Sequence, residues 1–209
     1  WQALCQACHQ LWDQLEIPQE SIKAMSVTTQ RATVVPMGAD GNPLRAAISW
    51  LDQRQIHSQP NLGAVESLLM RAVGAKVAVD TFHTQAEANW IAQHEPKLWQ
   101  QVDKLLLLSG YHNYKLTGDY KDSVASQVGF VPFDFKQLQW AEAKDWKWRA
   151  IPSIKREMLP ELVEAGGLLG HVNAAAAAET GIPEGLPLIA CGSDKACVVL
   201  GTGCLDSNT

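Results

Sequence analysis

The chain has 209 residues, a net charge of −5, and 46% hydrophobic and 19% charged residues, the composition of an ordinary globular protein with one large domain or at most two small ones. The negative charge, with no stripe of Lys and Arg, argues against nucleic acid as the main partner. The longest apolar runs, residues 105–108 and 186–190, are much shorter than the ~20 residues of a membrane-spanning helix, and no signal peptide pattern heads the chain, so we expect no membrane association.

The N-terminal part of the chain predicts a helix, a hairpin and a group of further helices. Apolar residues recur at helical spacing from Ala3 to Leu15, and residues 39–43 carry the Asp-Gly-Asn-Pro chemistry of a turn between strands. The predicted strands are residues 23–29, residues 32–37 and a segment that ends near Ile48; the predicted helices are residues 61–73, 84–93 and 96–101.

The C-terminal part also alternates between strands and helices. Residues 104–108 form an unbroken apolar run that predicts a buried strand, and the alanines of residues 173–180 predict a strong helix that Gly181 ends. Trp140, Trp146 and Trp148 are interpreted as packing groups in the core or between domains, in preference to a sugar-stacking platform. Further predicted helices are residues 111–116, 137–148 and 154–165, the last interrupted by Pro160, with a helix or ordered loop over 120–128.

Residues 186–203 are the most informative segment. An apolar run over 186–190 predicts a buried strand, Gly192 and Ser193 break it, and Asp194 falls near the start of the next helix. A carboxylate at that place has two interpretations. It can cap the helix, since Ser and Asp accept hydrogen bonds from the first N–H groups, or it can act as a general base at the carboxyl end of a strand, where open α/β sheets bind their ligands.

The five cysteines suggest no metal centre. Cys5 and Cys8, with His9, form one close group, but a zinc site needs four ligands and no second group at ligand spacing is evident. We interpret them as small thiols on a helix face, and Cys191, Cys197 and Cys204 as small groups suited to tight packing. An odd number of cysteines without a disulfide framework is typical of the reducing cytoplasm, the expected location.

Alternation of strands and helices, with one antiparallel hairpin, predicts a mixed α/β sheet. Four segments in order resemble the FGGY carbohydrate kinases, the family that includes the glycerol kinases and xylulokinases: Ser26 to Val35, Ala47 to Arg54, Leu105 to Phe135, and the Gly-Ser-Asp of residues 192–194. The resemblance implies an α/β, actin-like (ribonuclease H-like) ATPase domain with a mixed sheet and flanking helices, present in part. Residues 1–209 are then the sugar-binding N-terminal domain, incomplete at its N-terminus and without the C-terminal nucleotide-binding domain.

The resemblance also implies site residues. Asp194 would be the catalytic base, and Gln30 and Arg31 would bind substrate hydroxyls. The glycerol kinases of the family have Glu where this chain has Ala32, and a Tyr where it has Phe82, so two polar contacts are absent and a larger polyol or ketose is expected in place of glycerol. His83 or Lys195 would then fill the vacated space. Alternatively, Lys195 is a solvated lysine on the first helical turn without a role in binding.

ATP and Mg²⁺ are the cofactors that the family implies, yet the chain has neither of the family's two phosphate loops, and Gly201-Thr-Gly203 alone is a weak signal. We therefore expect the sugar-binding half of a kinase, inactive alone, with a homodimer as one open assembly. A non-catalytic sugar-binding or regulatory domain is the alternative function, and a structural remnant that binds nothing is a third. Asp52 and Arg54 predict an ion pair or a cap in preference to a sugar contact, and His112 and His171 have no evident partner.

Overall fold

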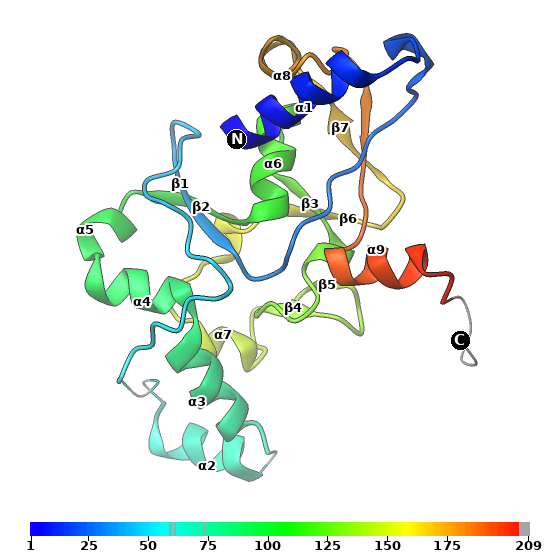
Figure 1. Ribbon diagram of the computed structural model, residues 1–209. Coiled ribbons are helices and arrows are strands. Elements are labelled where there is room, and N and C mark those ends of the chain that lie inside the picture. Colours follow the sequence, from blue (N-terminus) through cyan, green and yellow to red (C-terminus); the bar gives the residue numbers. More distant parts are fainter. Residues whose placement is uncertain (59, 61, 73, 205–209) are drawn as a thin grey trace. The chain divides into compact units, whose positions relative to one another are not determined.

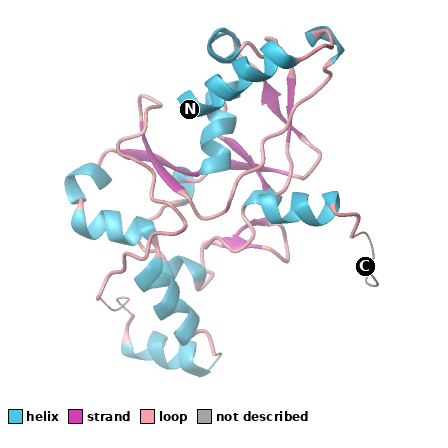
Figure 2. Cartoon of the chain, in the orientation of Figure 1, coloured by secondary structure: helices cyan, strands magenta, loops and turns pink. Residues whose placement is uncertain are grey.

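Short strands and helices are interspersed along the chain (Figures 1 and 2). The computed structural model describes residues 1–58, 60, 62–72 and 74–204. The helices are α1 Gln2–Gln14, α2 Ala64–Ala72, α3 Lys76–Gln85, α4 Glu87–His94, α5 Pro96–Trp99, α6 Leu108–Thr117, α7 Lys147–Ala150, α8 Ala174–Thr180 and α9 Asp194–Gly201. The strands are β1 Val34–Gly38, β2 Val102–Leu107, β3 Lys121–Ser123, β4 Phe133–Asp134, β5 Gln139–Trp140, β6 Glu161–Val163, β7 Leu168–His171 and β8 Pro187–Ile189.

These elements belong to two compact units, each built from separate stretches of the chain. Unit 1 contains residues 1–31, 107–127 and 160–209, and unit 2 contains residues 32–106 and 128–159. Within the described residues, no helix combines the length and the apolar character that crossing a membrane requires.

Unit 1 has a core formed by segments far apart in the sequence. Strands β7 and β8 pair antiparallel, β3 and β6 pair parallel, and α1 packs on α8 (Figure 1). The Trp12 indole N–H donates to the carbonyl oxygen of Thr180 at 2.9 Å, which ties the start of the chain to the end of α8. The buried residues of this core are Leu116, Leu169, Val172, Ala176, Ile182, Leu186, Leu188 and Ala190.

Unit 2 contains the predicted hairpin and a group of helices. Val34 pairs antiparallel with Ile48, and β1 also joins β2 in a two-stranded sheet. Helix α3 packs on α4 and α7. Trp140 is buried, with its ring edge-on to Phe133 at a centroid distance of 6.0 Å. The packing interpretation of this tryptophan is therefore confirmed.

Several expected elements are present because local chemistry specifies them. Asn173 caps α8 by accepting a hydrogen bond from the Ala176 N–H at 2.8 Å. Gly181 ends that helix with φ 73°, and Gly118 ends α6 with φ 85°, both in the left-handed region that favours glycine. The opening helix and the strand before Asp194 are also where the sequence predicts them.

The predicted helix over residues 137–148 is wrong. The Asp134 carboxylate accepts hydrogen bonds from the N–H groups of Lys136 and Gln137, which fixes a turn, and Leu138 adopts φ 53°, which no right-handed helix contains. The segment instead forms β5, and only the short helix α7 follows it. Local side-chain hydrogen bonds therefore override the amphipathic pattern.

The predicted helix over residues 154–165 is also wrong. Residues Arg156–Met158 form a single 3-10 turn, and the chain after Pro160 becomes β6, paired with β3. Proline lacks the N–H that a continuing helix would use. The segment over 120–128, expected to be a helix or an ordered loop, contains β3 and a 3-10 turn, Val124–Ser126.

Other predicted elements also differ from the structure. The expected strand over residues 23–29 is one parallel bridge between Met25 and Leu188. The expected helix over 84–93 begins at Glu87, and α3 before it was not predicted. The expected helix over 61–73 is α2, and its predicted end residues Asn61 and Val73 lie outside the described residues.

Candidate functional site

The Asp194 turn of unit 1 joins β8 to α9. Ser193 is the N-cap residue, with extended backbone at φ −67° and ψ 164°, and its side chain makes no capping hydrogen bond. Asp194 is the first helical residue, and its Oδ1 accepts a hydrogen bond from the Lys195 N–H at 2.7 Å. A carboxylate at the first position of a helix is favoured by the helix dipole. The N-cap position of α9 is occupied by Ser193 and not by Asp194.

Residues 25–31 run beside this turn. The Met25 N–H donates to the Pro187 carbonyl at 2.9 Å, and the Thr28 hydroxyl donates to the Gly192 carbonyl at 2.9 Å. The Asp194 N–H donates to the Thr29 carbonyl at 3.1 Å. The structure therefore brings Asp194 together with the segment that carries Gln30 and Arg31, both half-buried.

Small side chains make the turn possible. A Cβ added at Gly192 would lie 3.0 Å from the Cβ of Ala196 and 3.9 Å from that of Ala125. The Cys191 thiol donates to the Val27 carbonyl at 3.0 Å, and burial raises the pKa of this thiol. The expectation that Cys191 is a small packing group agrees with these contacts.

Asp122 is a buried carboxyl group to which the sequence analysis assigns no role. Its Oδ1 accepts hydrogen bonds from the Ser123 N–H at 2.8 Å and the Asn113 amide at 3.1 Å; its Oδ2 accepts from the Ser109 hydroxyl at 2.7 Å and the Gln127 amide at 2.6 Å. Burial raises the pKa of Asp122 to about 6, and the hydrogen bonds oppose that shift.

The Asp122 cluster, defined as Asp122 with Ser109, Asn113, Ser123 and Gln127, joins α6 to β3 and to the 3-10 turn that carries Ala125. Ala125 is one of the residues that Gly192 faces. The cluster therefore supports the packing behind the Asp194 turn. Nothing local in the sequence marks this role, because a carboxylate beside polar residues normally lies in water.

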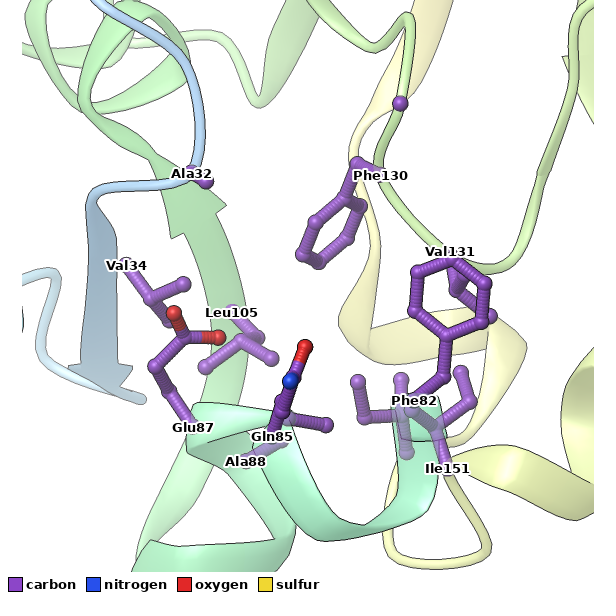
Figure 3. A pocket seen from close by; sticks show the side chains of 13 residues that line it. Ala32, Val34, Phe82, Gln85, Glu87, Ala88, Leu105, Phe130, Val131 and Ile151 are labelled. Atoms are coloured by element: carbon purple, nitrogen blue, oxygen red, sulfur yellow. The ribbon is translucent and has the colours of Figure 1, made fainter. Parts of the chain in front are cut away.

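Unit 2 contains a cavity of about 170 Å³ (Figure 3). Its walls are mostly hydrocarbon, and its polar side chains are Gln85 and Glu87. Ala32 lies at one side with φ 60°, a left-handed conformation that is unusual for alanine. The lining residues are Ala32, Val34, Phe82, Gln85, Ala86, Glu87, Ala88, Leu105, Gly129, Phe130, Val131, Ile151 and Ile154.

Phe82 and His83 are neighbours on α3 with different surroundings. Phe82 lines the cavity, whereas the buried His83 ring has its Nδ1 3.2 Å from the Ala150 carbonyl oxygen. Burial lowers the pKa of His83. The Asn89 amide donates to the same carbonyl at 2.7 Å. The structure thus places Phe82 and Ala32 on one cavity and His83 in the packing between α3 and α7.

The remaining charged candidates have clear surroundings. Lys195 is exposed on the first turn of α9. The Arg54 guanidinium forms two hydrogen bonds with Asp52, at 2.8 and 2.7 Å, and these hold the pKa of Asp52 down at about 2. The predicted Asp52–Arg54 ion pair is confirmed. Among the residues that the structure describes, His112 Nδ1 is buried without a hydrogen-bond partner, and no group of three or more His, Cys, Asp or Glu side chains could hold a metal ion.

Comparisons with known proteins agree with this architecture. A sequence profile of the N-terminal domain of the FGGY family of carbohydrate kinases matches residues 1–201. The chain is 30% identical to the uncharacterized sugar kinase YgcE of Escherichia coli over 209 residues, which is 100% of this chain and 35% of that protein. It is 26% identical to the xylulose kinase of Escherichia coli, covering 100% of this chain and 41% of that protein.

A solved structure shows the same fold. The ligand-bound xylulose kinase of Lactobacillus acidophilus superposes with a TM-score of 0.74 at 18% identity, covering 99% of this chain and 41% of that one. This similarity confirms the predicted α/β, actin-like (ribonuclease H-like) architecture. The chain spans less than half the length of the curated relatives it matches. Its whole length is similar to their N-terminal domain, and the chain belongs to the FGGY family of carbohydrate kinases.

Proposed function

We propose that the polypeptide containing this chain transfers the terminal phosphoryl group of ATP to a hydroxyl group of a sugar or polyol, with Asp194 as the general base. The observation that carries the proposal is the anchored turn at Asp194. Its backbone N–H is held by the Thr29 carbonyl, its Oδ1 accepts from Lys195, and its Oδ2 accepts no hydrogen bond from the described residues. That oxygen can accept a proton.

In the proposed reaction, Asp194 takes the proton of the attacking hydroxyl group. The hydroxyl oxygen forms a bond to the terminal phosphorus, the bond from that phosphorus to the bridging oxygen breaks, and ADP leaves. Mg²⁺ would neutralise phosphate charge, but the described residues present no fitting ligand group for it. We propose that this chain binds the sugar and holds the base, and that it is inactive alone.

We propose that substrate-binding residues lie beside the Asp194 turn of unit 1 and on the cavity of unit 2. Arg31 offers a planar fork of N–H donors to vicinal hydroxyls, and Gln30 offers an amide. Phe82 offers an aromatic face to C–H groups. Lys195 is proposed to contact the sugar or to hold Asp194 ionised. His83 is left out because its ring nitrogen already faces the Ala150 carbonyl. A reducing cytoplasm, which supplies ATP, is the proposed location.

The test is ADP release from ATP and Mg²⁺ over a panel of polyols and ketoses, with the longest natural polypeptide that contains this chain. We expect sugar-dependent release that falls by at least ~10²-fold in Asp194→Asn, the usual cost of losing a general base. A near-normal rate in that variant would contradict the assignment of the base. A folded protein that binds a sugar and releases no ADP would support the alternative, a non-catalytic sugar-binding domain, which Ala32 and Phe82 mildly favour.

A further inference from the structure

Gln85 and Glu87 point into the unit 2 cavity from the break between two helices. Helix α3 ends at Gln85, α4 begins at Glu87, and Ala86 between them is extended, with φ −66° and ψ 121°. Figure 3 shows Gln85 and Glu87 among the side chains that line the cavity, with the Phe82 and Phe130 rings also on its wall.

The cavity is large enough for an organic group. An apolar cavity of roughly 150 Å³ can hold benzene, and this one measures about 170 Å³. Its two aromatic rings can pack against C–H groups. A carbon chain of several atoms would therefore fit the walls, while Gln85 and Glu87 would select its polar substituents.

The Glu87 carboxylate suits an occupant that donates hydrogen bonds. Burial raises the pKa of Glu87, because the charged form loses water without full compensation. In the described part of the chain Glu87 forms no ion pair; Arg54 lowers the pKa of Glu87 less than Asp52 raises it, and Arg54 and Asp52 are paired with each other. No Lys or Arg lines the cavity, so a negatively charged occupant would find no counter-charge there.

We propose that Glu87 is a specificity-determining residue that accepts a hydrogen bond from a hydroxyl of the substrate and excludes sugar acids. The proposal rests on the proposed function. Ala32, on the same cavity, cannot accept a hydrogen bond, and Glu87 supplies the acceptor from another element. Gln85 donates to a neighbouring hydroxyl oxygen. The site is thus selective for neutral polyols or ketoses over aldonates of the same length, since a second carboxylate would be repelled.

The test compares Glu87→Gln and Glu87→Asp with Glu184→Gln, which makes the same charge change on an exposed loop. The substrates are the best neutral sugar from the panel and the sugar acid of equal length. In Glu87→Gln we expect KM for the neutral sugar to rise ~10- to 100-fold, as for loss of a charge-assisted hydrogen bond, with kcat within about two-fold of the unsubstituted protein. The relative kcat/KM for the acid should rise at least ~10-fold.

Glu87→Asp separates charge from reach. It should raise KM for the neutral sugar and still reject the acid, because the charge stays while the hydrogen bond lengthens. Circular dichroism checks that each variant folds, and Glu184→Gln should match the unsubstituted protein. Unchanged KM and unchanged discrimination in a folded Glu87→Gln protein would overturn the proposal.

Calorimetric measurement of the binding of the two sugars without ATP distinguishes a failure of the proposed function from a failure of the proposed role of Glu87. If the protein releases no ADP but binds the neutral sugar more tightly than the acid, and Glu87→Gln removes that preference, the proposed function fails and the role of Glu87 stands. If ADP release depends on Asp194 while Glu87→Gln binds both sugars as the unsubstituted protein does, the role of Glu87 fails and the proposed function stands.

Discussion

The backbone N–H of Asp194 donates a hydrogen bond to the carbonyl oxygen of Thr29 at 3.1 Å. This contact joins residues 165 positions apart in the sequence, and it fixes the start of α9 against the segment that leads to Arg31. The base and the hydroxyl-binding residues of the proposed site therefore share one backbone framework. Changes that move this framework are expected to affect turnover without touching a sugar.

Gly192→Ala tests the tight packing of the turn. The new Cβ would lie 3.0 Å from the Cβ of Ala196, closer than ordinary van der Waals contact, so we expect a loss of about 1–3 kcal/mol in unfolding free energy and a lower kcat. Urea unfolding and ADP release measure the two effects. The double variant Gly192→Ala with Ala196→Gly restores the space, so it should recover kcat, while its stability stays lower by the ~1 kcal/mol that glycine costs inside a helix. Failure of that rescue would show that the close approach is not the cause.

Asp122→Asn tests the buried cluster. Each carboxylate oxygen of Asp122 accepts from two donors, and an amide would turn one acceptor into a donor that faces donors. We expect a loss of about 2–4 kcal/mol, which lowers Tm by about 4–16 °C for a chain of this size. Asp119→Asn, at an exposed position on the same segment, should change stability by less than about 0.5 kcal/mol. Equal effects of the two changes would contradict the role of the cluster.

Two buried groups, Asp122 and His112, are expected to change the unfolding free energy with pH in opposite directions. Burial raises the pKa of Asp122 to about 6, so its contribution is complete below pH 3.8 and is lost as pH rises through 6. Burial lowers the pKa of His112 to about 4, so its contribution is complete above pH 6.5 and is lost as pH falls through 4. For each group, the contribution to the unfolding free energy changes by about 2 kcal/mol between pH 7 and pH 4.5.

Urea unfolding at those two pH values checks both signs. Relative to the unsubstituted protein, Asp122→Asn should become less stable on acidification and His112→Gln more stable, each by about 2 kcal/mol. The slope with pH is the readout, because hydrogen bonds lost in a variant shift its whole curve. Curves parallel to that of the unsubstituted protein would contradict the two titrations.

Ala32→Gly tests the left-handed backbone before β1. Alanine at φ 60° is strained by its Cβ, and glycine adopts this conformation freely, so we expect a gain of about 0.5–1 kcal/mol. Ala46→Gly is the matched control, since Ala46 is exposed and has no positive φ. It should lose stability through the greater freedom of glycine in the unfolded chain. Thermal unfolding measures the stability of both variants. A loss of stability in Ala32→Gly would show that the backbone at Ala32 is not strained.

The sequence predicts this fold well where a few neighbouring residues determine the structure. Asn173 and Gly181 bound α8, and the glycine turn before Asp194 separates a strand from a helix, so both could be located from local chemistry. The helix expected over 137–148 fails because the Asp134 carboxylate takes backbone N–H groups away from a helix. Strands β3 and β6 are short, and they form because each pairs with the other, so neither carries a local signal.

The candidate site divides in the same way. Asp194, Gln30 and Arg31 follow from family motifs, and their proposed roles stay predictions. Asp122 and Glu87 could not be identified from the sequence, because a carboxylate in a polar stretch normally lies in water. Burial by residues distant in the chain gives these two groups their unusual surroundings. Phe82 and His83 differ for a similar reason, since adjacent helical positions face different neighbours.

The hydrogen bond between Trp12 and Thr180 has a consequence for biosynthesis, since it spans 168 residues. At a synthesis rate of about 5–20 residues per second, α8 is made about 8–34 s after α1. Helix α1 packs on α8, and its Trp12 lies against the unit 1 core, most of whose residues lie between positions 169 and 190. Until those residues are made, the apolar side of α1 lacks most of the groups that cover it in the folded unit.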